Sequence, residues 1–301
     1  MKPKKAPRVW VFLGRPWGEW IFLTVMALLG LNAIRNGLTE EFHGLRQWSV
    51  QAGNIVFGLS ALGVVAATVA GHAAGIVLLW VFAASVCVAG PMAAWSYGDA
   101  TVAGAFLALL GTILASIGVV WYGTRRLHAS ITQRRWPALM ADHAAAADEF
   151  VAAISRMSAA EWTSRASAEA WSPAEITDHL ARTYSHFAGE ARGKNPLRIR
   201  LGPVRRTLAR LFVKPRLLSG AAFPKARAPR ELRPSNGPET PADGVAVFRA
   251  TGDACLRDLE ILHLRRPHRR MVHPYLGALP LYEILQFASQ HVRHHRRQLP
   301  S

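Results

Sequence analysis

Cysteines and acidic side chains are scarce in this chain of 301 residues. Its two cysteines, Cys87 in an apolar run and Cys255 in a predicted helix, exclude a disulfide-rich scaffold, a multi-cysteine zinc module and a cysteine-ligated iron–sulfur cluster. Asp and Glu number 19 against 36 Lys and Arg, which gives a formal net charge of +17. Charge of either sign is rare in residues 1–123, with 11 charged side chains, whereas residues 124–301 carry 44. The chain therefore has two physically different halves.

Long uncharged runs mark the N-terminal half. Residues 47–98 form a run of 52 without Asp, Glu, Lys or Arg, and residues 100–124 form another of 25. A helix that crosses a bilayer needs roughly 20 apolar residues. With the uncharged stretch from Trp20 to Ile34, these runs predict a transmembrane domain over residues 1–126 and exclude a wholly soluble protein. The four predicted spans are 17–34, 54–71, 75–97 and 102–122.

Basic residues flank these spans unevenly, and the short connections after the second and third spans contain no Lys or Arg. The positive-inside rule then places both termini in the cytoplasm, in a multi-pass protein of the inner (cytoplasmic) membrane. No small-x-small cleavage site ends the first apolar stretch, which favours an uncleaved anchor over a signal peptide. No acid, lysine or arginine falls at mid-span, so an anchoring role is favoured over transport. The flanking cations are Lys2, Lys4, Lys5, Arg8 and Arg15 before the first span, and Arg125, Arg126, Arg134 and Arg135 after the last.

The C-terminal half has the periodicity of helices and no alternating β-branched runs, so the predicted fold class is all-α. We expect a linker at 127–138 and an antiparallel four-helix bundle over 139–301. The strongest helix start lies at Ser172, an N-cap followed by Pro173 and by Glu175, which closes a capping box. The expected helices cover about 139–158, 171–191, 241–262 and 280–298.

Histidines offer the chemistry of this half. His291 and His295 are spaced i,i+4 on the last helix, so their imidazoles project from one face and can converge on one ion. Alone, this pair is a weak signal and more often belongs to the solvated end of a basic helix, so a third ligand is needed. His179, flanked by Ile176 and Leu180 near the start of the second helix, is the candidate to face the same cavity.

The order of these motifs resembles the DinB-like superfamily. The resemblance rests on Trp171-Ser172-Pro173-Ala174-Glu175-Ile176 with His179-Leu180, on His273-Pro274-Tyr275-Leu276-Gly277, and on the segment from Phe287 to Gln298. It covers about 139–299 and leaves the membrane half without a family. The resemblance implies a four-helix bundle that holds a divalent metal, usually zinc or nickel, on three histidines, which map onto His179, His291 and His295.

Known relatives include transferases and isomerases that use a low-molecular-weight thiol such as bacillithiol or mycothiol. The resemblance thus implies a metal-dependent enzyme, of thiol S-transferase or hydrolase type, acting on an unidentified small molecule. The alternative is a non-enzymatic metal- or ligand-binding sensor or structural module coupled to the membrane domain. A closed structural site needs a fourth protein ligand, for which His273 is the candidate, whereas an enzyme needs an open coordination position.

The sequence offers no clear second catalytic group, so the catalytic residues stay unknown. We assign Glu175 to the helix cap and Asp178 to solvent or to the surroundings of His179. His273 and Tyr275 are expected in a loop that sets the direction of the last helix. His186 and His294 are given no role.

A basic insertion separates the second and third helices. Residues 192–233 hold 13 Lys and Arg against one acid, Glu231, with apolar residues interleaved. Such a segment, tethered behind a cytoplasmic span, is expected to lie on anionic lipid headgroups. A solvated loop is the plainer alternative, and nucleic-acid binding is disfavoured because interleaved Tyr or Trp and any recognisable module are lacking. The expected partners are the bilayer, its anionic headgroups and a small-molecule substrate; self-association stays open.

Overall fold

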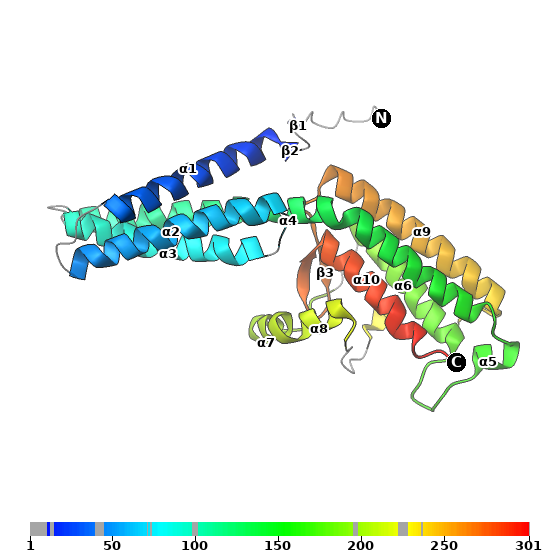
Figure 1. Ribbon diagram of the computed structural model, residues 1–301. Helices are drawn as coiled ribbons and strands as arrows, with labels where there is room; N and C mark the ends of the chain where they lie inside the picture. Colours follow the sequence, from blue (N-terminus) through cyan, green and yellow to red (C-terminus); the bar gives the residue numbers. More distant parts are fainter. Residues whose placement is uncertain are drawn as a thin grey trace. The chain divides into compact units, whose positions relative to one another are not determined.

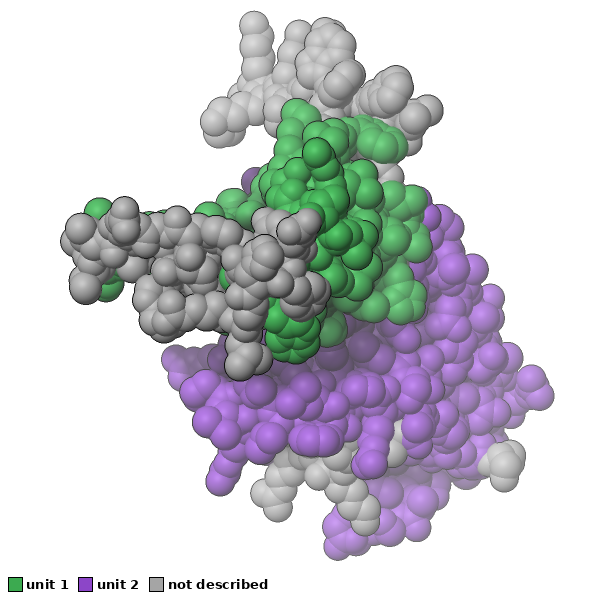
Figure 2. All heavy atoms as spheres, turned by 60° about the vertical axis from the view of Figure 1, so that its left-hand side comes forward, with its two compact units in different colours: residues 1–131 green, residues 132–301 purple. Residues whose placement is uncertain are grey.

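The computed structural model describes residues 11–12, 15–39, 45–70, 72, 74–97, 102–194, 198–221, 228–235 and 237–300. Helices dominate these residues, as the all-α prediction requires. The chain divides into two compact units, residues 1–131 and 132–301, which Figure 2 colours separately.

The first unit is built from long helices joined by short connections (Figure 1). Its described elements are β1 (Val11–Phe12), β2 (Arg15–Pro16), α1 (Trp17–Thr39), α2 (Leu45–Ala70), α3 (Ala74–Tyr97) and the first part of α4 (Val102–Ile154). Its core is a cluster of buried side chains, namely Met26, Ala61, Val64, Leu79, Phe82, Ala83, Val120 and Leu127.

Small residues let α1 and α2 approach each other closely. A Cβ atom on Gly58 would lie 2.6 Å from the carbonyl oxygen of Gly30, a separation that real Cβ atoms do not adopt. Only glycine therefore fits at this crossing, and Ala61, one turn later, is completely buried. Small residues at helix contacts are typical of helices that pack in lipid.

Two helices of this unit are long and apolar enough to cross a membrane, judged by length and composition. They are Trp20–Thr39 and Val50–Ala70, and only 33% of the apolar window in each is buried within the protein. Large apolar side chains such as Leu28, Val77 and Trp80 lie 60–65% exposed. Much of the apolar surface of these helices therefore faces outward.

The sequence predicted four spans, and α3 contributes a shorter apolar stretch, Ala74–Val88, among the described residues. The third and fourth spans and the side of each terminus stay predictions. Lys2, Lys4, Lys5 and Arg8, on which the topology partly rests, lie outside the described residues.

In its described residues, the second unit contains four long helical segments, short helices between them and one hairpin (Figure 1). Its described elements are the end of α4, α5 (Ala159–Thr163), α6 (Pro173–Ala191), α7 (Pro203–Leu208), the π-helical η1 (Ala209–Val213), α8 (Lys214–Ser219), the 3-10 helix η2 (Arg230–Leu232), α9 (Pro241–Arg265), β3 (Arg270–His273), β4 (Gly277–Pro280) and α10 (Leu281–Arg296). The long helical segments are the end of α4, α6, α9 and α10.

Aromatic side chains join the four long segments in one core. Phe150 of α4 lies 4.8 Å from Phe248 of α9 between ring centroids, and Tyr184 of α6 lies 5.5 Å from the same ring. Phe187 of α6 in turn contacts Phe287 of α10 at 6.4 Å. Burial of such rings supplies much of the packing energy of a small helical domain.

The structure differs from the sequence prediction at residues 127–138, which were expected to form a linker. These residues are helical, because α4 runs without a break from Val102 to Ile154 and includes Pro137. Buried apolar side chains continue through the segment at helical spacing, at Leu127, Ile131 and Trp136. This packing compensates for the backbone hydrogen bond that a proline cannot donate inside a helix.

The hairpin is a second difference, since residues 273–277 were expected to form a loop and strands were not predicted. β3 pairs antiparallel with β4, with Met271 opposite Leu279 and His273 opposite Gly277. Gly277 adopts a φ of 72°, a left-handed conformation that favours glycine. The strands escaped detection because each has four residues, too few for an alternating pattern to emerge.

We predict that His143 makes the second unit sensitive to acid. His143 is buried beside Tyr184, with Nε2 2.8 Å from the phenolic oxygen, and burial lowers its pKa to about 4. In the unfolded chain His143 takes up a proton near pH 6.5, whereas the buried ring does so only near pH 4. The free energy of unfolding therefore has its full value above pH 6.5 and decreases as the pH falls toward 4. The loss amounts to about 3 kcal/mol.

Urea unfolding at pH 7 and near pH 4, on the protein and on His143→Gln, measures this effect. Between the two pH values, the free energy of unfolding of the variant should decrease by about 3 kcal/mol less than that of the parent. His72→Gln, at an exposed position of the first unit, is the control and should behave as the parent does. An unchanged pH dependence in His143→Gln would contradict the assignment.

Candidate metal centre

Helix α6 carries the first of the three histidines, and its start is fixed by the predicted capping box. The Ser172 hydroxyl accepts a hydrogen bond from the Glu175 backbone N–H at 3.3 Å, and the Glu175 carboxylate accepts one from the Ser172 N–H at 2.8 Å. Pro173 occupies the first turn, as expected. This cap sets the register in which His179, 4% exposed, faces the interior of the bundle.

Helix α10 carries the other two histidines one turn apart. It begins at Leu281, directly after the last hairpin residue, Pro280, so the hairpin determines where the helix starts. Residues of the buried face, among them Ile284 and Ala288, hold the helix against the core. His291 and His295 follow on that side; His295 is buried and His291 is partly exposed.

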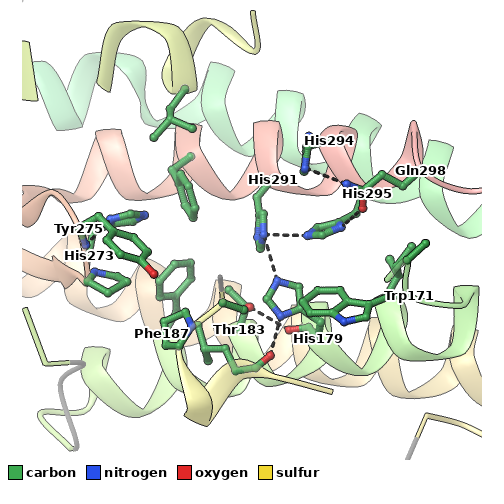
Figure 3. Close-up of a pocket in the computed structure, with 18 of the residues that line it drawn as sticks. Trp171, His179, Thr183, Phe187, His273, Tyr275, His291, His294, His295 and Gln298 are labelled. Atoms are coloured by element: carbon green, nitrogen blue, oxygen red, sulfur yellow. Dashed lines mark hydrogen bonds between the residues drawn. The ribbon is translucent and has the colours of Figure 1, made fainter. Parts of the chain in front are cut away.

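The three imidazoles converge (Figure 3). The Nε2 atom of His291 lies 3.2 Å from Nε2 of His179 and 3.0 Å from Nε2 of His295. One ligand atom from each residue lies within 4.8 Å of the others. A tetrahedral zinc ion with Zn–N bonds of about 2.0–2.1 Å separates neighbouring nitrogens by roughly 3.3 Å. The spacing of these nitrogens therefore fits a single divalent ion.

The outer nitrogens of two of these rings are held by hydrogen bonds. His179 donates from Nδ1 to the carbonyl oxygen of Leu232 at 2.6 Å, and His295 donates from Nδ1 to the Oε1 atom of Gln298 at 2.7 Å. A proton on each Nδ1 leaves the lone pair of Nε2 directed at the common centre. Partners of this kind orient ligand histidines and raise their basicity.

Burial favours the neutral form of all three rings. Burial is the main cause that lowers the pKa of His179, and it lowers the pKa of His291 and His295 well below the usual range for histidine. Neighbouring imidazoles add to the effect by repelling a positive charge: mainly His295 and His179 act on His291, and His179 and His294 act on His295. Neutral imidazole is the form that binds a metal.

The histidines open onto a cavity of about 680 Å³ (Figure 3). Trp171 lies beside two of the three histidines, with its ring centroid 4.9 Å from that of His179 and 6.1 Å from that of His295. The cavity is walled mainly by apolar side chains and includes residues of the basic insertion. The lining residues include Trp171, Ile176, Thr183, Phe187, Leu217, Ala228, Pro229, Leu232, His273, Tyr275, Phe287 and His294.

His273, the candidate for a fourth ligand, is not part of the cluster. Among the described residues the group able to hold an ion consists of His179, His291 and His295 alone. His273 instead accepts hydrogen bonds at Nδ1 from the backbone N–H groups of Tyr275 and Leu276, at 3.3 and 3.2 Å. Burial lowers its pKa to about 4. Its role in the hairpin turn is therefore structural, although His273 and Tyr275 also line the far end of the cavity.

The remaining candidates stand apart from the cluster. Asp178 accepts hydrogen bonds from Arg182 at 2.8 Å and from the Ser235 backbone N–H at 2.9 Å, so it holds the segment just after the insertion onto α6. His186, two turns after His179 on α6, lies outside the cavity lining and the cluster. His294 lines the cavity and contacts Gln298 at 3.0 Å.

Sequence reasoning missed the groups that surround the ligands. Gln298 follows His295 by three residues, a helical spacing that brings the two side chains together. The sequence could therefore have predicted the hydrogen bond between them. The Leu232 carbonyl left no signal, because a backbone acceptor 53 residues from His179 is placed only by the fold.

Comparison with known proteins assigns the C-terminal half to a family. Residues 142–299, just over half of the chain, match the family described as the DinB superfamily. This confirms the resemblance seen in the motifs. Searches of curated proteins and of solved structures found no match to the chain.

We predict that Gln298 supports metal binding through His295. Loss of such a partner weakens metal affinity by about 10–100-fold, so Gln298→Ala should raise the dissociation constant for zinc by that factor. Gln298→Glu keeps an acceptor at the same place and should retain the affinity. Competition with a chromophoric chelator measures the constants, and equal constants for Gln298→Ala and the parent would contradict the role.

Proposed function

The chain belongs to the DinB superfamily, and on this basis we propose that His179, His291 and His295 hold one divalent ion, zinc or nickel, in a metal-dependent enzyme. The observation that supports this most is the geometry of three buried or half-buried imidazoles that face a large cavity without a fourth protein ligand among the described residues. Structural zinc sites, by contrast, are normally closed by four protein ligands.

The ligand set favours chemistry at the metal over mere structural support. Three neutral ligands leave the double positive charge of the ion uncompensated. An ion held in this way supplies a Lewis acid that lowers the pKa of water or stabilises a thiolate. His179 and His295 are oriented by hydrogen bonds to Leu232 and Gln298, so their Nε2 atoms are directed at a common centre.

The cavity favours a substrate with a sizeable apolar part. Trp171, Phe187 and Phe287 present aromatic surface to it, and such walls exclude water from the reacting groups. Tyr275 and Glu169 are lining residues able to carry or exchange a proton. A thiol S-transferase or a hydrolase is the reaction class that this combination supports.

A nucleophilic thiol would have to come from a cosubstrate. Cys255 is 1% exposed, and burial raises its pKa to about 12, so it is not a reactive thiolate at neutral pH. Cys87, the other cysteine of the chain, lies on α3 of the first unit. A low-molecular-weight thiol of the bacillithiol or mycothiol type fits this requirement.

The first unit is proposed to anchor the enzyme in the inner membrane by four spans, with both termini in the cytoplasm. Two helices with the length and composition to cross a membrane support the anchoring. The outward-facing apolar side chains of the unit support it too, since such a surface is costly in water.

The alternative is a sensor or structural module, in which metal binding is not followed by catalysis. It requires a coordination sphere that the protein closes. An open position at the metal therefore separates the two proposals, and it can be observed without knowledge of the substrate.

We predict that the cobalt-substituted protein binds an added thiol at the metal. On addition of 2-mercaptoethanol to the Co²⁺-loaded chain, a sulfur-to-cobalt charge-transfer band should appear and saturate at about one thiol per cobalt. His186→Ala, on the same helix as His179 but outside the cluster, should give the same band. Cobalt that binds in the three-histidine site but shows no change with thiol would contradict the enzyme and favour the closed module.

A further inference from the structure

The basic insertion is packed against the bundle in its described part. Residues 203–219, formed by α7, η1 and α8, are called here the insertion helix. Arg210 donates hydrogen bonds to the carbonyl oxygens of Leu276 and Ala278 at 2.8 and 2.5 Å, which fixes the helix to the hairpin. Residues 203–219 are therefore a packed helical segment and not a solvated loop.

Further contacts fix the same side of the insertion helix to α10. Lys214 forms an ion pair with Glu283 at 2.6 Å, and Gln286 donates to the carbonyl oxygen of Leu218 at 2.9 Å. Leu217 is 5% exposed and lines the cavity. One side of the helix is therefore committed to the bundle.

The opposite side is apolar and exposed. Val204, Leu208, Leu211 and Phe212 are 73%, 50%, 62% and 66% exposed. Their positions, i, i+4, i+7 and i+8, form the stripe that a helix normally buries. Here the stripe faces outward, and these four residues are called the outer apolar face. A contiguous exposed apolar surface of this kind marks a binding surface for a protein or a membrane.

The charges around this face are of one sign. Arg205 lies next to Val204 and is exposed, and the exposed Arg198 and Arg216 precede and follow the stripe in the sequence. Residues 198–221 contain no Asp or Glu. An apolar stripe bordered by arginines matches an anionic lipid surface, where the stripe enters the boundary of headgroups and acyl chains and the guanidinium groups meet phosphates.

We propose that the insertion helix docks on an anionic membrane surface through its outer apolar face, with Arg205 and Arg216 among the headgroups. A nucleic acid fits this surface poorly, because Val204, Leu208 and Leu211 offer bases no stacking partner. This docking relies on the membrane anchoring proposed for the first unit: a bundle tethered to an anchored unit meets the lipid surface at a high effective concentration, so a modest intrinsic affinity is sufficient.

Hydrogen–deuterium exchange on the full chain in lipid nanodiscs tests the docking, because both faces of a nanodisc are open to solvent. Peptides covering 203–219 are compared in discs of phosphatidylcholine alone and in discs that also contain phosphatidylglycerol. Exchange should be slower in the anionic discs. Peptides from α9 serve as the internal reference and should exchange equally in both.

Two variants separate the contributions of charge and of apolar contact. Each arginine near an anionic surface strengthens docking about fivefold, so Arg205→Gln with Arg216→Gln should weaken it about 25-fold and remove the slowing. Arg257→Gln with Arg265→Gln, at exposed positions of α9, makes the same charge change and should leave the slowing intact. Leu211→Ser with Phe212→Ser should also abolish it without changing exchange in α9.

Three results would overturn the proposal. These are equal exchange of 203–219 in the two kinds of disc, slowing that survives Arg205→Gln with Arg216→Gln, and slowing in neutral discs caused by an added oligonucleotide or acidic protein. The last result would assign the face to a different class of partner.

Discussion

The convergence of three imidazoles from two helices is the constraint on which the second unit depends. His179 on α6 and the pair His291 and His295 on α10 lie with Nε2 atoms 3.0–3.2 Å apart across the two contacts measured at His291. Three imidazoles can lie this close together in a folded interior because burial favours their neutral form, so the rings do not repel one another as cations would. The Leu232 carbonyl and Gln298 then select the tautomer that directs two lone pairs inward.

Several parts of the fold serve this arrangement. The capping box at Ser172 fixes the register of α6, and the hairpin that ends at Pro280 fixes the start of α10. The basic insertion supplies the Leu232 carbonyl, which accepts a hydrogen bond from His179, and Leu217, which lines the cavity. The same insertion carries the proposed lipid-binding face, so the surface that would meet the membrane and the wall of the cavity belong to one short segment.

The sequence was informative where the signal is local. The cap at Ser172, the four helices of the bundle and the i,i+4 spacing of His291 and His295 follow from short patterns, and the structure has all of them. Three features did not follow from local pattern. The hairpin strands are too short to alternate visibly, α4 continues through Pro137 because packing outweighs a lost backbone hydrogen bond, and the Leu232 carbonyl is placed by tertiary structure. The metal itself is inferred from chemistry and family, and no pattern identifies it.

Metal content tests the central claim most directly. The full chain, purified without added metal and then loaded with zinc or nickel, should hold about one ion per chain by mass spectrometry. Its extended X-ray absorption fine structure should report three imidazole nitrogens at about 2.0–2.1 Å from the metal. His179→Ala and His291→Ala should each lose the ion. A folded chain that binds neither metal, or that binds one equally well without His179 and His291, would contradict the three-histidine site.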